Sequence, residues 1–241
     1  MSDVKQVIEI LSNRQQSRAL GLCMVSSEKT LQEALDAGYR VKYLFCSSGF
    51  ECTADCEERF TVKENIIRKI TGVRSARGFA AAVYRKEKEG VLSAADNCVL
   101  LDRIQDPANM GAIIRSGAAF GFTSYLLEDC ADPFLEKTVR ASAGAVFKCD
   151  FFYDGIEQAE NLVKKGAVLA CSEVKSGMAP DALKGKKGLI LALGNEGEGV
   201  SEKVRSMAGL KVRIDYPGEV ESLNVAAAAA ILFYETAGKA G

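Results

Sequence analysis

The sequence contains no histidine, no tryptophan and only four prolines among its 241 residues. Histidine is the side chain that most often accepts a proton near neutral pH. Its absence excludes Ser-His and Cys-His nucleophilic systems, and it also excludes a mixed Cys/His zinc site. Any proton transfer must therefore use another group.

Long apolar runs are missing as well. The longest candidate, residues 225–233, is too short to span a bilayer and is followed by Tyr234 and Glu235. Residues 1–6 also lack a basic segment that leads into an apolar stretch. We therefore expect a cytoplasmic protein without membrane contact.

The eight cysteines are scattered among apolar segments, at positions 23, 46, 52, 56, 98, 130, 149 and 171. Without a secretory leader, this distribution predicts reduced and mostly buried thiols instead of disulfides. Cys46, Cys52 and Cys56 form a local cluster, but their spacing is not that of a zinc-binding Cys-x-x-Cys pair. We expect no bound metal, and the role of this cluster stays open.

The net charge of −1 hides an uneven distribution. Residues 1–88 carry 15 Lys and Arg against 11 Asp and Glu, a net charge of +4, which leaves −5 for residues 89–241. The stretch 63–88 alone holds eight basic residues against two acidic ones. Such a stretch is either a solvated helix face or a surface that binds phosphates.

Apolar periodicity divides the chain into two α/β parts. In the first part, strands are predicted at 22–25, 41–46 and 78–84, and helices at 11–20, 29–37 and 64–70, with Gly38 as a helix stop. The polar stretch 85–90 is typical of a linker. We predict a small domain over 1–88, a linker over 89–96 and a larger domain over 97–241.

In the larger part, predicted strands alternate with predicted helices. The strands are at 98–101, 124–127, 167–170, 188–193 and 211–214, and the helices at 110–120, 135–141, 156–165 and 222–236. This alternation predicts a parallel sheet with helices on both faces. Because such sheets bind ligands at the carboxyl ends of their strands, three loops there are candidate sites.

The first loop leads from a strand into a helix that carries Asn109 and Arg115. We predict that Asn109 caps this helix and that Arg115 projects one to two turns into it. The small residues 117–119 indicate close helix packing.

The second loop, Gly-Asn-Glu-Gly-Glu-Gly at 194–199, directly follows an apolar strand. Its glycines permit a positive φ or a close approach to a ligand, and Glu196 adds a carboxylate. The pattern is neither a P-loop nor a dinucleotide-binding turn, which argues against a nucleotide-dependent doubly wound enzyme. Its carboxylates favour a cationic or neutral ligand.

The third loop contains Pro217 and Gly218 and leads through Ser222 and Asn224 into an alanine-rich helix. On local pattern, Ser222 is predicted to cap this helix.

In this order and spacing, the three segments resemble the signature motifs of the SpoU (TrmH) family of RNA 2′-O-ribose methyltransferases. The matching residues are Asp-Pro-x-Asn-x-Gly-x-x-x-Arg at 106–115, the loop 194–199, and Glu-Ser-Leu-Asn-Val at 221–225. Residues 137–147 are similar to a further family segment, and residues 18–35 and 75–83 to the small N-terminal RNA-binding domain of many members.

The resemblance implies an α/β fold of the SPOUT type. Its C-terminal part would be a trefoil-knotted, parallel-sheet methyltransferase domain, preceded by a small α/β RNA-binding domain. The family acts as a homodimer whose active sites form across the two copies. Its cofactor is S-adenosylmethionine, held in a bent form largely by backbone groups.

Site residues follow from the same correspondence. The cofactor-binding residues would be Leu193, Gly194, Ile214, Leu223 and Asn224. The catalytic and substrate-orienting residues would be Asn109, Arg115, Glu196, Ser222 and Asn224. Because a guanidinium is normally protonated, we interpret Arg115 as a clamp on the phosphate beside the target ribose. The base stays open among Arg115, that phosphate and Glu196.

One departure from the family pattern concerns the cofactor. Members often have Ile-Pro-Met where this chain has Ile214, Asp215 and Tyr216, so the affinity for S-adenosylmethionine is in question.

The implied substrate is a structured RNA, with ribosomal RNA favoured over transfer RNA by the compact N-terminal part. The residues expected to contact RNA are Arg18, Lys63, Arg68, Lys69 and Arg140. Two alternatives stay open: a transfer RNA 2′-O-ribose methyltransferase, and a non-catalytic RNA-binding protein of the same fold.

Overall fold

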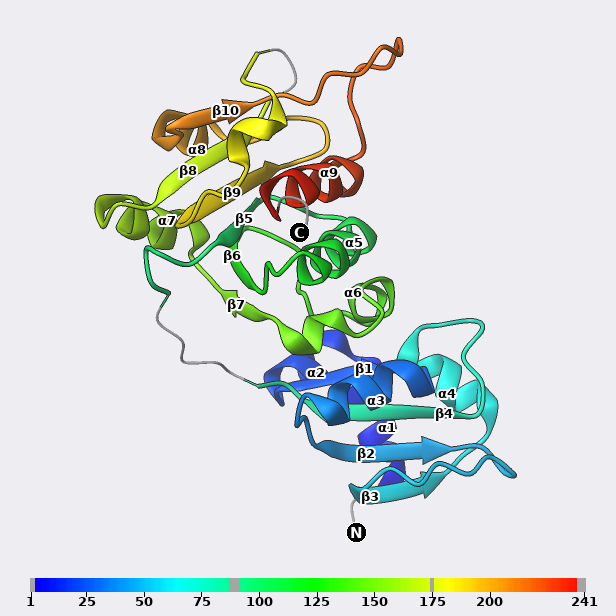
Figure 1. The fold of residues 1–241 in the computed structure, drawn as a ribbon. Coiled ribbons are helices and arrows are strands. Elements are labelled where there is room, and N and C mark those ends of the chain that lie inside the picture. The colour runs from blue at the N-terminus through cyan, green and yellow to red at the C-terminus, as the bar shows by residue number, and fades with distance from the viewer. Residues whose placement is uncertain (1–2, 87–91, 174–175, 238–241) are drawn as a thin grey trace. The chain divides into compact units, whose positions relative to one another are not determined.

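The computed structural model describes residues 3–86, 92–173 and 176–237, which form two compact units (Figure 1). Unit 1 comprises Met1–Glu87 and Pro133–Phe147, and unit 2 comprises Lys88–Asp132 and Lys148–Gly241. The segment 133–147, which the sequence pattern assigns to the larger domain, thus groups with unit 1. Residues 89–91 of the predicted linker lie outside the described residues, and the domain boundaries stay a prediction.

Unit 1 contains a mixed four-stranded sheet. Its strands are β1 (Leu22–Val25), β2 (Val41–Cys46), β3 (Cys56–Thr61) and β4 (Phe79–Tyr84), in the order β1-β4-β2-β3. The pairing of β2 with β3 is parallel, and the other two pairings are antiparallel. Sequence patterning misses β3 because Phe60 is its single buried residue, as expected for a polar edge strand.

The helices of unit 1 are α1 (Val4–Ser12), α2 (Arg14–Ala19), α3 (Glu28–Asp36), α4 (Glu64–Thr71) and α6 (Glu136–Ala141), with the 3₁₀ helix η1 (Ala145–Lys148) beginning in the same segment. The single helix predicted over 11–20 is wrong, because Asn13 adopts an extended conformation between α1 and α2. Its side chain accepts hydrogen bonds from Gln15 N and Gln16 N, so it caps α2. Gly38, at φ +73°, ends α3 as predicted.

The core of unit 1 lies between its sheet and two helices. Val7 and Leu11 of α1 and Ile67 of α4 pack with Tyr43 and Phe45 of β2. On the segment 133–147, α6 contacts β1, and the Ser26 hydroxyl donates a 2.7 Å hydrogen bond to Glu136.

Unit 2 contains a six-stranded sheet in which every pairing is parallel, as the sequence predicts. The strands are β5 (Cys98–Asp102), β6 (Ser124–Glu128), β7 (Asp150–Phe152), β8 (Val168–Ser172), β9 (Leu189–Gly194) and β10 (Leu210–Val212), in the order β10-β8-β9-β5-β6-β7. The central strands β5 and β9 are buried on both faces, which explains their uninterrupted apolar sequences.

Four α-helices and the 3₁₀ helix η2 (Pro180–Leu183) belong to unit 2. They are α5 (Pro107–Ala119), α7 (Gly155–Lys164), α8 (Glu202–Met207) and α9 (Val225–Ala237). Side chains of α7 and α8 form one core with the sheet, while α5 packs along α9 (Figure 1). Gly117 of α5 permits close packing, because a Cβ there would lie 2.2 Å from Tyr125 Oη.

All eight cysteines lie within the described residues, and none of them is in a disulfide; five of them are buried. Within the same residues, no group of three or more Cys, Asp or Glu side chains is placed to hold a metal ion. No described helix is long and apolar enough to cross a membrane.

Candidate active site in unit 2

The glycine-rich loop 195–199 follows β9 and is fastened to the end of the neighbouring strand β5. Asn195 Nδ2 donates to Arg103 O at 3.1 Å, and Arg103 Nη2 donates to Gly199 O at 3.3 Å. The Arg103 guanidinium also pairs with Glu198, and the buried Asp102 accepts from Ser201 N. These contacts hold the loop at both ends.

Gly194, the last residue of β9, and Gly199, the last residue of the loop, are both required by the geometry. A Cβ on Gly194 would lie 2.1 Å from the backbone of Gly199 and Val200, so no side chain fits there. Gly199 has φ +70°, a conformation that side-chain-bearing residues rarely adopt. Within the loop, Asn195 Oδ1 accepts from Gly197 N at 2.9 Å.

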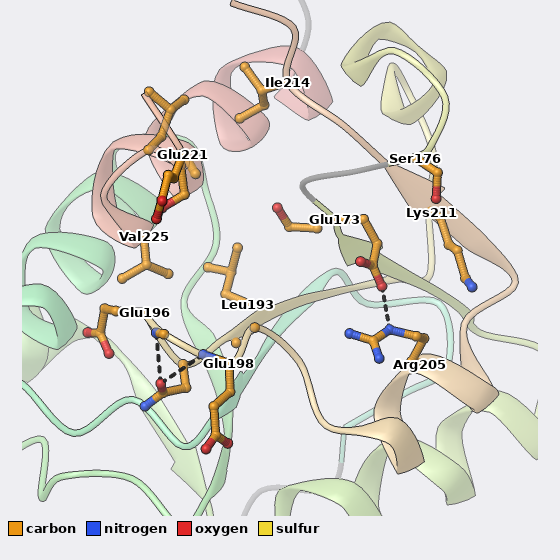
Figure 2. Close-up of a pocket in the computed structure, with 18 of the residues that line it drawn as sticks. Glu173, Ser176, Leu193, Glu196, Glu198, Arg205, Lys211, Ile214, Glu221 and Val225 are labelled. Carbon is orange, nitrogen blue, oxygen red and sulfur yellow. Dashed lines mark hydrogen bonds and ion pairs between the residues drawn. The ribbon is translucent and has the colours of Figure 1, made fainter. Parts of the chain in front are cut away.

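This loop, the end of β8 and the loop that precedes α9 line a pocket of about 700 Å³ (Figure 2). Four of the predicted cofactor residues lie in its wall: Leu193, Gly194, Ile214 and Leu223. Glu196 and Ser222 of the predicted catalytic set line it as well. The structure thus brings together residues from two of the three motifs in one cavity.

The remaining motif, at 106–115, reaches the pocket through a chain of amide hydrogen bonds. Asn224 Nδ2 donates to Asn109 Oδ1 at 3.0 Å, and Asn109 Nδ2 donates to Glu196 Oε1 at 2.7 Å. Asn224 Oδ1 accepts from Ala226 N at 2.9 Å, which fixes the orientation of its amide. We call this chain of Asn224, Asn109 and Glu196 the amide relay; it orients one carboxylate at the pocket.

Two predicted helix caps, Asn109 and Ser222, are wrong. Asp106, not Asn109, caps α5 by accepting from Ala108 N, so the Asn109 side chain is available for Glu196. Asn224, not Ser222, caps α9, which begins at Val225. The exposed Ser222 lies before the helix, in the wall of the pocket.

Arg115 is exposed on α5, outside the lining of this pocket. It makes no hydrogen bond or ion pair with any residue that the structure describes. It lies six positions after Asn109, which on an α-helix is a rise of about 9 Å and a face about 120° away. The structure of one chain therefore does not bring Arg115 to the amide relay.

Sequence reasoning missed the polar side of the pocket that lies away from Glu196. Glu173, Ser176, Arg205 and Lys211 lie there (Figure 2), and Arg205 Nε donates to Glu173 Oε1 at 2.6 Å. The hydrogen bond to Glu173 raises the pKa of Arg205 above its ordinary value. A signal was present, because Glu173 directly follows the carboxyl end of β8.

Two thiols of unit 2, Cys171 and Cys130, are unsuited to accept or donate protons near neutral pH because burial raises their pKa. Burial raises the pKa of Cys171, near the end of β8, to about 11. Burial likewise raises the pKa of Cys130 to about 11. Both remain protonated near neutral pH.

The unusual sequence Asp215-Tyr216 has separate roles for its two side chains. Tyr216 lines the pocket and donates a 3.2 Å hydrogen bond to Glu221 O. Asp215 points to Arg213 instead, in an ion pair of 2.5 Å. Ile214 itself remains in the pocket wall.

The residues predicted to contact RNA all lie in unit 1 and are exposed; they are Arg18, Lys63, Arg68, Lys69 and Arg140. Arg68 pairs with Glu64 at 2.8 Å and Arg140 with Glu136 at 3.7 Å. The Arg68–Glu64 pair is exposed and contributes little stability, and the Arg140 side chain is itself exposed although Glu136 is largely buried, so both arginines are available to a phosphate.

The SpoU rRNA methylase family model matches residues 96–234, more than half of the chain. The chain belongs to the SpoU rRNA methylase family. One relative of this SpoU methylase is the 23S rRNA (guanosine(2553)-2′-O)-methyltransferase RlmP of Bacillus subtilis, 28% identical over 89% of this chain and 88% of that protein. Another is the 23S rRNA (guanosine-2′-O-)-methyltransferase RlmB of Xanthomonas campestris pv. campestris, 33% identical over 67% of this chain and 68% of that protein.

Solved structures show the same fold over nearly the whole length of this SpoU methylase. AviRb from Streptomyces viridochromogenes in complex with AdoMet has a TM-score of 0.83 and 23% identity, and the match covers 98% of this chain and 97% of AviRb. An AdoMet-bound rRNA methyltransferase from Sinorhizobium meliloti has a TM-score of 0.82 and 23% identity, over 98% and 96% of the two chains.

Proposed function

We propose that this SpoU methylase transfers the methyl group of S-adenosylmethionine to a ribose 2′-hydroxyl of 23S ribosomal RNA. The observation that carries this proposal is the pocket whose wall holds Leu193, Gly194, Ile214 and Leu223 and whose rim carries the amide relay. A site for the methyl donor and a group that can orient the acceptor are thereby adjacent.

The residues of the pocket fit S-adenosylmethionine. A volume of about 700 Å³ is within the usual range for a small-molecule site. Leu193, Ile214, Leu223 and Val225 offer an apolar slot for adenine, and Glu196 and Glu221 place negative charge beside a cation. When bound, the cofactor supplies an electrophilic methyl group on a positively charged sulfonium.

The chain's own residues then have to orient and deprotonate a ribose hydroxyl, which is a poor nucleophile. The amide relay leaves the second oxygen of Glu196 without a partner among the described residues, in position to accept a hydrogen bond from that hydroxyl. We assign Arg115 to the adjacent phosphate, since a guanidinium is normally protonated. The final proton acceptor stays open between Glu196, that phosphate and Arg115.

We further propose that the active form is a homodimer in which Arg115 serves the pocket of the second copy. The exposed aromatic pair Phe120 and Tyr234, with ring centroids 6.0 Å apart, and the exposed Ile231 give α5 and α9 an apolar surface suited to such an interface. The position of Arg115 outside the pocket of its own chain supports this arrangement. A trefoil-knotted path of the C-terminal segment is part of the proposal.

Unit 1 is proposed as the RNA-binding part, on account of its exposed basic residues. Ribosomal RNA is favoured over transfer RNA because a relative that matches 89% of the chain is a 23S rRNA enzyme. Because ribosomal RNA is found in the cytoplasm, we propose a soluble, cytoplasmic enzyme.

Mapping of 2′-O-methylation tests the proposed function directly. We expect RNA from cells that lack the gene to lose one 2′-O-methyl group in 23S rRNA, and purified wild-type protein with S-adenosylmethionine to restore it. Loss of a transfer RNA modification instead would support the transfer RNA alternative. Purified protein that binds RNA but not S-adenosylmethionine would support the non-catalytic one.

Mixing two inactive variants tests the shared site. In a heterodimer of Arg115→Ala and Glu196→Ala chains, one pocket has an intact Glu196 and receives an intact Arg115 from the other copy. We expect each variant alone to be inactive, and a refolded equimolar mixture to recover roughly a quarter of wild-type turnover, since half of the dimers carry one complete site. A mixture without recovered turnover, but with heterodimers present, would show that Arg115 does not act across the dimer.

A further inference from the structure

The polar side of the pocket contains a carboxylate that the proposed mechanism does not use. Glu173 follows β8 and lines the pocket, with a side chain only 17% exposed. One oxygen, Oε1, accepts from Arg205 Nε at 2.6 Å. The other oxygen has no hydrogen-bond partner among the described residues. An unpaired carboxylate oxygen on a largely buried side chain that lines a ligand pocket indicates a donor on the ligand.

Arg205 is anchored on three sides and holds Glu173 in place. Besides Glu173, its guanidinium donates to Glu202 Oε2 at 3.1 Å and to Val200 O at 3.3 Å. A guanidinium with these three partners positions the Glu173 carboxylate and is not itself a contact for a ligand. The hydrogen bond between Arg205 and Glu173 joins α8 to the end of β8.

We infer that Glu173 accepts hydrogen bonds from the ribose hydroxyls of S-adenosylmethionine and that Arg205 positions it to do so. The inference rests on the proposed function. A carboxylate is well suited to this task because it offers only acceptors, and vicinal hydroxyls offer two donors. Dinucleotide-binding sheets use an acidic side chain in the same way, on the ribose hydroxyls of their cofactor.

Charge decides between the ribose and the amino group of the cofactor. The cations of Arg205 and Lys211 lie on the same side of the pocket as Glu173 (Figure 2) and offset the charges of Glu173 and Glu202, so this side offers an ammonium group no net negative charge, whereas neutral hydroxyls need none. Glu196 lies away from Glu173 (Figure 2), where the positively charged part of the cofactor is favoured. This placement puts the ribose at Glu173 and the sulfonium towards the amide relay.

Calorimetric binding of S-adenosylhomocysteine tests the inference without turnover. We expect Glu173→Gln to weaken binding about 10-fold or more, because a charge-assisted hydrogen bond is lost. Glu202→Gln is the matched control: it removes another carboxylate partner of Arg205 but lies outside the pocket lining, and should leave the affinity within about twofold. Equal affinities of Glu173→Gln and wild type would overturn the inference.

Two ligand analogues identify the group that Glu173 contacts. Methylthioadenosine keeps the ribose and lacks the amino acid, so Glu173→Gln should weaken its binding by the same factor as for S-adenosylhomocysteine. An analogue without ribose hydroxyls should bind wild type and Glu173→Gln equally, because the two losses concern one interaction. If Glu173→Gln leaves methylthioadenosine binding unchanged, Glu173 contacts the amino acid and the inference is wrong.

Arg205→Lys separates positioning from folding. We expect it to raise the KM for S-adenosylmethionine about 10-fold with kcat nearly unchanged, whereas a folding defect would lower the active fraction and hence kcat. An unchanged KM would overturn the role of Arg205. Wild-type protein that binds none of these nucleosides would instead refute the proposed function, so the two failures are distinguishable.

Discussion

The two units differ in what their charged side chains do. Unit 1 carries a net charge of +4 and unit 2 a net charge of −5. In unit 1 the predicted RNA-contacting residues stand exposed, whereas in unit 2 Asn224, Asn109 and Glu196 are tied to one another by hydrogen bonds. The whole-chain net charge of −1 therefore conceals two different uses of charge. The cations of unit 1 are suited to attract a polyanion, and the polar side chains of unit 2 are suited to orient a reacting group.

The difference also predicts how each unit responds to mutation. A surface of separate cations loses affinity in small increments as each cation is removed, because each acts on its own phosphate. A connected set such as the amide relay loses its function when one member is removed, because the others then lose their orientation.

The largest expected effect is that of Asn109→Ala in unit 2. It removes the link between Asn224 and Glu196, and we expect kcat to fall about 100-fold or more while the affinity for S-adenosylmethionine stays within about threefold. Single-turnover methylation and calorimetry measure the two quantities. The control is Asn97→Ala: Asn97 accepts from Leu189 N at 3.0 Å, away from the pocket, so its loss should lower stability but not kcat.

The next effect is expected in unit 1 when Lys63, Arg68 and Lys69 are replaced together by Ala. RNA affinity should fall about 10-fold at low salt, and its dependence on salt should become shallower by about two to three units of slope. The affinity for S-adenosylmethionine should not change. Filter binding over a series of salt concentrations measures both, with a triple replacement of the exposed Lys164, Lys165 and Lys187 in unit 2 as the control. Equal losses in the two triple variants would remove the proposed division of labour.

Gly117→Ala should destabilise unit 2 alone. Alanine favours a helix over glycine by about 1 kcal/mol, but here its Cβ would lie 2.2 Å from the Tyr125 hydroxyl, a buried group, and overpacking of this kind costs about 1–3 kcal/mol. Hydrogen exchange should report faster opening of α5 and β6, with no change in β2 and β4. Gly209→Ala, which meets only Leu169 O at 4.0 Å, is the control.

The smallest effect concerns thiol labelling, which should distinguish the units near neutral pH. Burial raises the pKa of Cys98 to about 12, so its reactive thiolate is scarce, whereas Cys52 and Cys56 of unit 1 are half-buried and accessible. Mass spectrometry after brief iodoacetamide treatment at pH 7.5 should find label on Cys52 and Cys56 first. Early label on Cys98 would indicate that unit 2 opens readily.

The raised thiol pKa also sets the direction of the pH dependence of stability. The pKa of Cys98 in the folded state lies above the ordinary value of 9.0, so folding favours the neutral thiol. Its contribution to stability is complete below pH 9.0 and is lost as the pH rises towards about 12. Denaturant midpoints should therefore fall over this alkaline range, and a Cys98→Ala variant should show a smaller fall.

Much of the fold could be predicted from the sequence because its central strands are apolar on both faces. The apolar runs around β5, β8 and β9, alternating with predicted helices, are typical of a parallel sheet covered by helices. Strands with few buried side chains or few residues were not predicted. The strand β3 has one buried side chain, and β7 has only three residues. Local pattern alone does not distinguish them from loops.

Prediction of the site was limited by contacts between distant residues. Asn109 and Ser222 have the side chains of helix caps, and only the actual ends of α5 and α9 reveal that Asp106 and Asn224 do the capping. Glu173 and Arg205 are separated by 32 positions, and each alone has the pattern of a surface residue. The assignment of a pocket role to such a pair requires the sheet order that brings the end of β8 beside α8.

The fastening of the glycine-rich loop to β5 has a consequence for protein engineering. Loop 195–199 is held by Asp102 and Arg103, which lie more than 90 positions earlier in the sequence. Arg103 bonds to Asn195 at the start of the loop, and Asp102 bonds to Ser201 just after its end. A graft of this loop into another sheet would keep its shape only if those two residues were transplanted with it. The transferable part of this molecule is thus a discontinuous pair of segments, and libraries that randomise one segment should hold the other fixed.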